Sequence, residues 1–133
     1  MSQENVERVH RVYDAINRGD LEAMLALLHP EGEFIPRLLG LEGGGIYRGH
    51  DGVREWWQSI FSAFPDFNAT VLEVRAVADA TVSNVRFQGR GEGSGVPFED
   101  TIWQVVRWRD GKAIWVKSYR DRADALEAAG LSE

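Results

Sequence analysis

The sequence predicts a single α+β domain in which a curved antiparallel sheet carries the N-terminal helices on its concave face. In three stretches before Pro65, apolar side chains recur every three or four positions, as they do in amphipathic helices. From Phe67 to about Asp121 the pattern changes to runs of roughly 10 to 14 residues that are rich in β-branched and aromatic side chains. Strands usually have about five or six residues, so strands of this length should bend strongly. Helices packed on such a sheet give a cone-shaped α+β barrel with a cavity at its wide end.

The first third of the chain predicts two helices and a short strand. The first helix should run from about residue 4 to 18, because one face of it is apolar: Val6, Val9, Tyr13 and Ile16. Gly19 should end this helix, and Asp20 is placed to cap a second, shorter helix that ends near His29-Pro30. The stretch GEFIP then predicts a short strand that Pro36 stops.

A third helix, four strands and a terminal helix should follow. The glycine-rich stretch from Leu38 to Gly49 predicts a loop or flap. The third helix should end at Pro65 and present one wide apolar face: Val53, Trp57, Ile60, Phe61 and Phe64. Turn signals at Asp79-Ala80, GEGSG and Asp110-Gly111 separate the four strands, and a short helix that ends at Gly130 closes the chain.

Composition excludes several classes of function. The 133 residues and 15.0 kDa fit one domain that spans residues 1–133. A net charge of −6 argues against nucleic acid, whose phosphates require a basic surface. No apolar run approaches the roughly 20 residues that cross a membrane, and no basic segment leads into an apolar one at the start. There is no cysteine, which excludes disulfides and thiolate chemistry. We therefore predict a cytoplasmic protein with no nucleic-acid and no membrane partner.

We predict neither a metal nor a cofactor. His10, His29 and His50 lie in different predicted elements, and none has a second histidine or a carboxylate at the spacing that metal sites use. The stretches GEGSG and LEGGG do not link a strand to a helix with the glycine and lysine spacing of a phosphate-binding loop. The first is predicted to be a hairpin tip and the second a flap.

At this level of detail the chain resembles the SnoaL-like group of the NTF2-like (nuclear transport factor 2-like) superfamily. The resemblance rests on INRGDLEAMLALLHPEGEF (16–34), YRGHDGVREWW (47–57), AFPDF (63–67), GRGEGSGVPFED (89–100) and VRWRDGKAIWVKSYRDRADALEAAGL (106–131). It covers the chain almost end to end. It implies a cone-shaped barrel, usually a homodimer that forms through the outer sheet surface. It implies no single chemistry, because the group includes cyclases, isomerases, hydrolases and binding proteins.

Two of the reactions that this resemblance suggests need catalytic residues that this sequence does not have at the matching positions. In the ketosteroid isomerase branch the base is an aspartate that matches Ile35, and Ile35 cannot take a proton. The oxyanion-hole tyrosine of that branch would fall near Val12, so Tyr13 is one residue, or about 100°, away on a helix. Its protonated aspartate matches Gln104, which can donate a hydrogen bond but is not an acid. The epoxide-hydrolase type needs a second aspartate besides Asp121, and we identify none.

The polyketide cyclase members imply one acid–base aspartate, which matches Asp121, helped by Gln104 and Tyr119. Asp121 has a competing interpretation as the cap of the last helix, with Asp124 three residues later. Tyr119 is also explained as a half-buried strand residue. Gln104 favours function most, because a polar amide on the core-facing side of a strand needs partners, such as water or a ligand in a cavity.

The aromatic residues predict the walls of that cavity. The sequence is 11% aromatic and has five tryptophans, more than packing of a small core requires. The ligand-binding candidates are Tyr13, Phe34, Trp57, Phe61, Phe87, Trp108 and Trp115. The opposite, convex face carries Trp103 and Val105, which suggests an apolar surface that a second subunit covers.

Two functions remain open at this point. One is a pocket for an apolar, oxygen-bearing small molecule, either bound or converted by a lyase-, isomerase- or cyclase-like step with Asp121 as acid–base residue. The other is a non-catalytic dimerising module whose cone is filled by side chains. An open pocket of roughly 300 Å³ or more, faced by Gln104 and Asp121, would support the first.

Overall fold

A computed structural model describes residues 2–37 and 45–130 of the chain. The predicted flap from Leu38 to Gly49 therefore lies largely outside the described residues. The elements follow one another as α1 (Ser2–Arg18), α2 (Leu21–Leu25), β1 (Leu28–Ile35), β2 (Tyr47–Arg48), α3 (Gly49–Ala63), β3 (Asn68–Val77), β4 (Ala80–Arg90), β5 (Pro97–Arg109), β6 (Lys112–Tyr119) and α4 (Arg122–Ala128). The predicted α+β order is confirmed.

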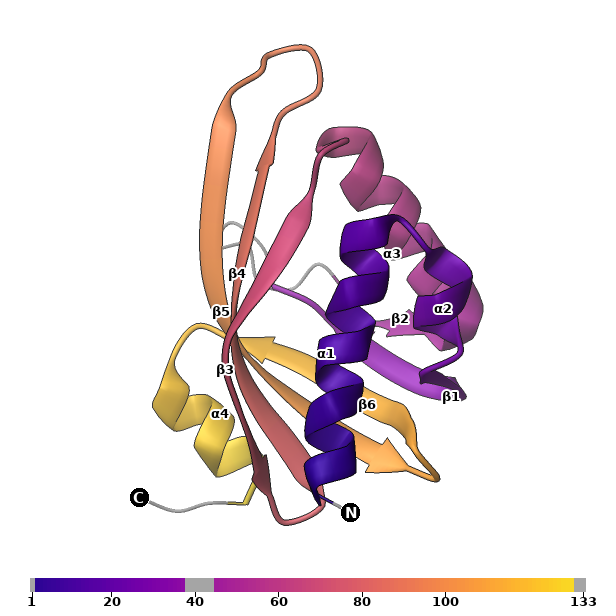
Figure 1. Ribbon diagram of the computed structural model, residues 1–133, viewed down its shortest axis with the longest axis vertical. Helices are drawn as coiled ribbons and strands as arrows, with labels where there is room; N and C mark the ends of the chain where they lie inside the picture. Colours follow the sequence, from indigo (N-terminus) through magenta and orange to yellow (C-terminus); the bar gives the residue numbers. More distant parts are fainter. Residues whose placement is uncertain (1, 38–44, 131–133) are drawn as a thin grey trace.

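The strands form one curved sheet that does not close into a barrel (Figure 1). Its order is β2-β1-β6-β5-β4-β3, so β2 and β3 are the two edges. Neighbouring strands are antiparallel except β1 and β6, which run parallel. The prediction of four long antiparallel strands is confirmed for β3 to β6. It missed that β1 inserts beside the last strand of the chain, which is a long-range pairing.

The helices lie on both faces of the sheet (Figure 1). Helix α1 packs against β3 and β4, and α3 packs against β1, so these two cover the concave face. Helix α4 packs against β5 and β6 on the opposite, convex face. No helix in the described ranges is long and apolar enough to cross a membrane.

The second helix is shorter than predicted and the strand after it begins earlier. Helix α2 ends at Leu25, and β1 already begins at Leu28, so His29 and Pro30 belong to the strand. Pairing with β6 explains the difference, since Leu28 pairs with Ala113 before the register shifts by several residues to Glu33.

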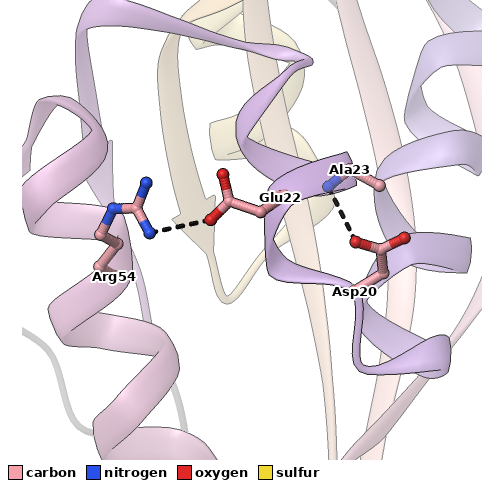
Figure 2. A network of polar contacts seen from close by, with 4 residues as sticks. All are labelled: Asp20, Glu22, Ala23 and Arg54. Carbon is pink, nitrogen blue, oxygen red and sulfur yellow. Dashed lines mark hydrogen bonds and ion pairs between the residues drawn. The ribbon is translucent and has the colours of Figure 1, made fainter.

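The two short connections around α2 are fixed by local polar contacts. Gly19 has φ +71°, the left-handed conformation that ends a helix without strain. The Asp20 carboxylate accepts a hydrogen bond from the Ala23 backbone N–H at 3.1 Å, which confirms Asp20 as the cap of α2 (Figure 2). Next to it, Arg54 of α3 donates to Glu22 of α2 at 2.9 Å, an exposed ion pair that joins the two helices (Figure 2).

The apolar interior has two parts, one on each side of the sheet. The larger cluster lies between the concave face and helices α1 and α3. The smaller one lies under α4, where Leu126 and Ala125 bury Val82 and Val105 on the convex face. Val105 is therefore covered within the same chain, and the convex surface is less open than the sequence suggested.

Candidate functional site

A partly enclosed cavity lies between the concave face of the sheet and helices α1 and α3. Its volume is about 70 Å³. One water molecule needs roughly 10–15 Å³ of such space, so the cavity suits several waters or a small ring. It is smaller than the roughly 300 Å³ expected from the sequence. Met24 lines it and is a flexible side chain that can move for a larger ligand.

The walls of the cavity are mostly apolar. The aromatic side chains that line it are Tyr13, Phe34, Trp56, Phe67, Phe87 and Trp108. Aliphatic residues from both helices and from the sheet complete the lining, among them Val9, Ile16, Val53 and Val106. In a pocket with apolar walls, the few polar groups determine the orientation of the ligand and the specificity for it.

Tyr13 and Gln104 meet inside this cavity. The Tyr13 hydroxyl donates to the Gln104 Oε1 at 2.7 Å, and both residues are buried, with exposed fractions of 5% and 6%. Strand alternation places Gln104 on the concave face together with Ile102 and Val106, as predicted. Helix α1 supplies Tyr13 from the same face as Val9 and Ile16. Tyr13 was predicted as a ligand-binding residue, and it lies in the lining of the cavity, one position after the residue that matches the ketosteroid isomerase tyrosine.

This pair leaves hydrogen-bonding capacity for a ligand. A side-chain amide has a donor end and an acceptor end, and Tyr13 uses only one of them. No other side-chain bond to Gln104 occurs in the described part of the chain. Gln104 itself lines the cavity, so its amide N–H is the group left for a ligand there.

Tyr13 acts as a neutral donor at ordinary pH. Burial raises the pKa of its hydroxyl well above the ordinary value, and the hydrogen bond to Gln104 offsets only part of this. The phenol therefore keeps its proton and donates it to the Gln104 Oε1, which leaves the amide N–H of Gln104 as the donor for a ligand oxygen.

Gln104 is flanked by two serines on the neighbouring strands. In the sheet register it pairs with Ser83 of β4 and Ser118 of β6, so all three side chains share the concave face. Ser118 lines the cavity. The Ser83 Oγ is fully buried and has no hydrogen-bond partner in residues 2–37 and 45–130. Neither serine was predicted as a site residue, although pairing across the two predicted hairpins places both of them beside Gln104.

Asp121 and Tyr119 lie elsewhere. Asp121 is exposed, occupies the N-terminal cap position of α4 and makes no side-chain cap bond. Tyr119 is half-buried on the convex face beside α4, with the Lys117 ammonium 5.2 Å from its ring centre. Burial raises the pKa of Tyr119, while Arg107 lowers it and Asp124 raises it further. Neither residue lines the cavity, so the structure does not bring them together with Gln104.

Four of the seven aromatic candidates line the cavity and three do not. Tyr13, Phe34, Phe87 and Trp108 line it. Trp57 and Phe61 pack on each other, with ring centres 4.7 Å apart, and Trp115 lies on the convex face with Arg107.

Trp56 takes the place that was predicted for Trp57. The buried residues of α3 are Val53, Trp56 and Ile60, a helical spacing that was present in the sequence.

The position that matches the ketosteroid isomerase base does not face the cavity. Ile35 pairs with Lys117, whose side chain is on the convex face, and Ile35 is not among the lining residues. Phe34 lines the cavity instead, and neither Phe34 nor Ile35 carries a carboxylate.

Comparison with models of protein families shows the family to which the chain belongs. Residues 9–116 match the model of the SnoaL-like domain. The chain belongs to the SnoaL-like domain family. No curated protein matches the chain.

Solved structures of this SnoaL-like fold are similar over nearly the whole chain. IdmH, a candidate polyketide cyclase from Streptomyces antibioticus, is 26% identical with a TM-score of 0.73, covering 96% of this chain and 99% of IdmH. A candidate SnoaL-like polyketide cyclase from Jannaschia sp. CCS1 is 19% identical with a TM-score of 0.76, covering 99% and 95%. TerC, co-crystallised with polyporic acid, is 22% identical with a TM-score of 0.76, covering 96% and 98%.

Proposed function

We propose that this SnoaL-like protein binds a small, mostly apolar compound in the concave cavity and holds one oxygen atom of that compound with the amide N–H of Gln104, which the hydrogen bond from Tyr13 keeps in position. The observation that carries the proposal is the buried 2.7 Å hydrogen bond between these two side chains, within apolar walls. Buried polar groups are costly unless they are paired, and this pair leaves one end of the amide for a ligand. The TerC neighbour, crystallised with a small molecule, supports the same use of the fold.

Conversion of the ligand is the sharper form of this proposal. An amide N–H that a neutral phenol holds in place stabilises charge that develops on a carbonyl oxygen, which suits a lyase-, isomerase- or cyclase-like step. Such a step also needs an acid–base group near the reacting carbon. Asp121 does not meet this need from its exposed position, so the geometry supports binding before conversion.

The competing function is a non-catalytic dimerising module. The observation that favours it is the small volume of the cavity, about 70 Å³. Binding experiments distinguish the two, because a module with a filled cone takes up no small molecule at this place.

A matched pair of probes tests the proposal. Acetophenone and ethylbenzene have similar size, but only acetophenone has a carbonyl oxygen. We expect the wild-type protein to bind acetophenone more tightly by about threefold to tenfold, the worth of one neutral hydrogen bond. Dissociation constants can be measured by NMR titration of the tryptophan indole signals.

Variants assign this preference to the site. Gln104→Leu and Tyr13→Phe should reduce the preference for acetophenone toward unity. Tyr119→Phe is the matched control, because it removes a hydroxyl on the convex face and should keep the preference. Equal affinity of the two probes for the wild-type protein would contradict the assigned role of the pair.

A further inference from the structure

Ser118 contributes a second hydroxyl to the wall of the cavity. On β6 it follows Val116 at the two-residue spacing of a strand, and both residues line the cavity. Ser118 is buried, with an exposed fraction of 8%. Within the two described ranges, 2–37 and 45–130, no group forms a hydrogen bond with its side chain. A buried hydroxyl without a partner costs free energy, so this one is placed to bond to a molecule that enters the cavity.

The charged and titratable residues of the lining are engaged within the protein. The Nδ1 of His29 accepts a hydrogen bond from the Glu31 backbone N–H at 3.0 Å. The Glu33 carboxylate lies 3.4 Å from the Arg48 guanidinium, and Arg37 also interacts within the chain. All three lining residues belong to β1 or come just after it. We therefore expect a neutral ligand, whose polar atom meets the walls that α1, β5 and β6 supply.

Among the described residues, these walls present three uncharged polar side chains: Tyr13, Gln104 and Ser118. Gln104 and Ser118 are direct neighbours across the β5–β6 ladder. Side chains paired in this way have Cβ atoms about 4.5–5.5 Å apart. Two hydrogen bonds of about 2.8 Å that meet at one oxygen from directions about 120° apart need donor atoms about 4.8 Å apart. The cross-strand spacing thus suits two donors that share one ligand oxygen.

We infer that Ser118 is a second ligand-binding residue, whose hydroxyl donates to the same ligand oxygen that the Gln104 amide N–H holds. The inference rests on the proposed function, which supplies that oxygen. It narrows the ligand class to neutral compounds with a carbonyl group, because the two lone pairs of a carbonyl oxygen accept two hydrogen bonds at about this angle. Two donors also stabilise negative charge that develops on that oxygen.

Ser118→Ala and Ser83→Ala are a matched pair of variants. Both remove a buried hydroxyl beside Gln104, but only Ser118 lines the cavity. With two hydrogen bonds to the carbonyl, we expect the wild-type protein to prefer acetophenone over ethylbenzene by about tenfold. Ser118→Ala should reduce this ratio of dissociation constants about threefold, and Ser83→Ala should not change it. NMR titration of the tryptophan indole signals measures the ratio.

The carbonyl stretching frequency of bound acetophenone provides a second readout. Each hydrogen bond to a carbonyl oxygen lowers this frequency, because it weakens the C=O bond. The band should therefore lie at a lower frequency in the wild-type complex than in the complex with Ser118→Ala. The Ser83→Ala complex should have the wild-type frequency. Infrared difference spectra with an isotope-labelled carbonyl measure the band.

An unchanged ratio and an unchanged band in Ser118→Ala, with the ratio still lowered by Gln104→Leu, would overturn the role of Ser118 and leave the pocket intact. An equal loss in Ser83→Ala would also overturn it, because that hydroxyl does not line the cavity. A ratio that does not depend on Gln104 would instead overturn the proposed function.

Discussion

Tyr13 and Gln104 are 91 positions apart in the chain, yet each is the hydrogen-bond partner of the other. The inward position of Gln104 follows from the alternation of β5, which is readable in the sequence. That Tyr13 is the hydrogen-bond partner of Gln104 cannot be read from the sequence, because it depends on where α1 crosses the sheet.

Tyr13→Phe should lower the free energy of unfolding by about 1–3 kcal/mol, because it leaves a buried amide of Gln104 without its partner. Urea denaturation measures this. Tyr119→Phe on the convex face is the comparison and should have a smaller effect, since its side chain is half-buried. Equal losses in the two variants would show that the Tyr13 hydroxyl is not specially placed.

Stability should fall at alkaline pH because of Tyr13. Its folded-state pKa is raised above the ordinary value of 10.0, so the folded state keeps a proton that the unfolded state loses. This contribution is fully present below pH 10 and is lost as the pH rises above it, by up to about 1.4 kcal/mol per pH unit. Tyr119 shifts in the same direction, so the difference between wild type and Tyr13→Phe isolates the Tyr13 term. Parallel stability curves from pH 9 to 11 would refute it.

Asp121→Asn should change neither probe binding nor, by more than about 0.5 kcal/mol, stability. The side chain is exposed and makes no cap bond. Thermal denaturation and the acetophenone titration measure the two effects. A clear loss of binding would restore Asp121 to the site.

Asn17 secures the edge of the sheet at the scale of elements. Its side-chain amide donates to the Ala69 carbonyl and accepts from the Ala69 N–H, both at 2.8 Å, so it takes the place of a neighbouring strand on β3. Long edge strands otherwise invite pairing with other chains. Asn17→Asp should destabilise the fold by about 1–2 kcal/mol, because the carboxylate faces the Ala69 carbonyl without a donor.

Asn5→Asp is the matched control in the same helix, since Asn5 accepts from Arg8 and an aspartate can do the same. Chemical denaturation of both variants measures the difference. Equal stability of the two variants would mean that the bonds to Ala69 contribute nothing measurable.

Elements with strong local patterns could be predicted, and elements made by long-range pairing could not. The hairpin at Asp110-Gly111 and the cap at Asp20 follow from local residues, and both are present. The start of β1 at Leu28 depends on β6, which lies more than eighty residues later. Trp56 and Trp57 are adjacent and chemically alike, so only the packing of α3 selects Trp56 for the cavity.

At the scale of the whole molecule, we propose a homodimer that forms through the part of the convex face that α4 leaves open. Asn84 Oδ1 and Arg86 Nε are buried there without a hydrogen-bond partner in the described chain. Both residues belong to β4, and Arg86 pairs with the exposed Thr101 of β5. A second copy could supply the missing partners.

Thr101→Arg should weaken such a dimer, because it places a second cation beside Arg86. Ser62→Arg, at an exposed position of α3, is the control and should leave the dimer intact. Light scattering coupled to size exclusion measures the mass. A wild-type monomer at all concentrations would exclude this interface.

The account depends on a cavity in which Gln104 meets a ligand. The most direct measurement is the NMR signal of the Gln104 side-chain amide during titration with acetophenone. The account predicts a saturable shift of this signal that follows the same dissociation constant as the indole signal of Trp108, which lines the same cavity. Shifts confined to residues outside the cavity, with the Gln104 amide unmoved at saturation, would contradict it.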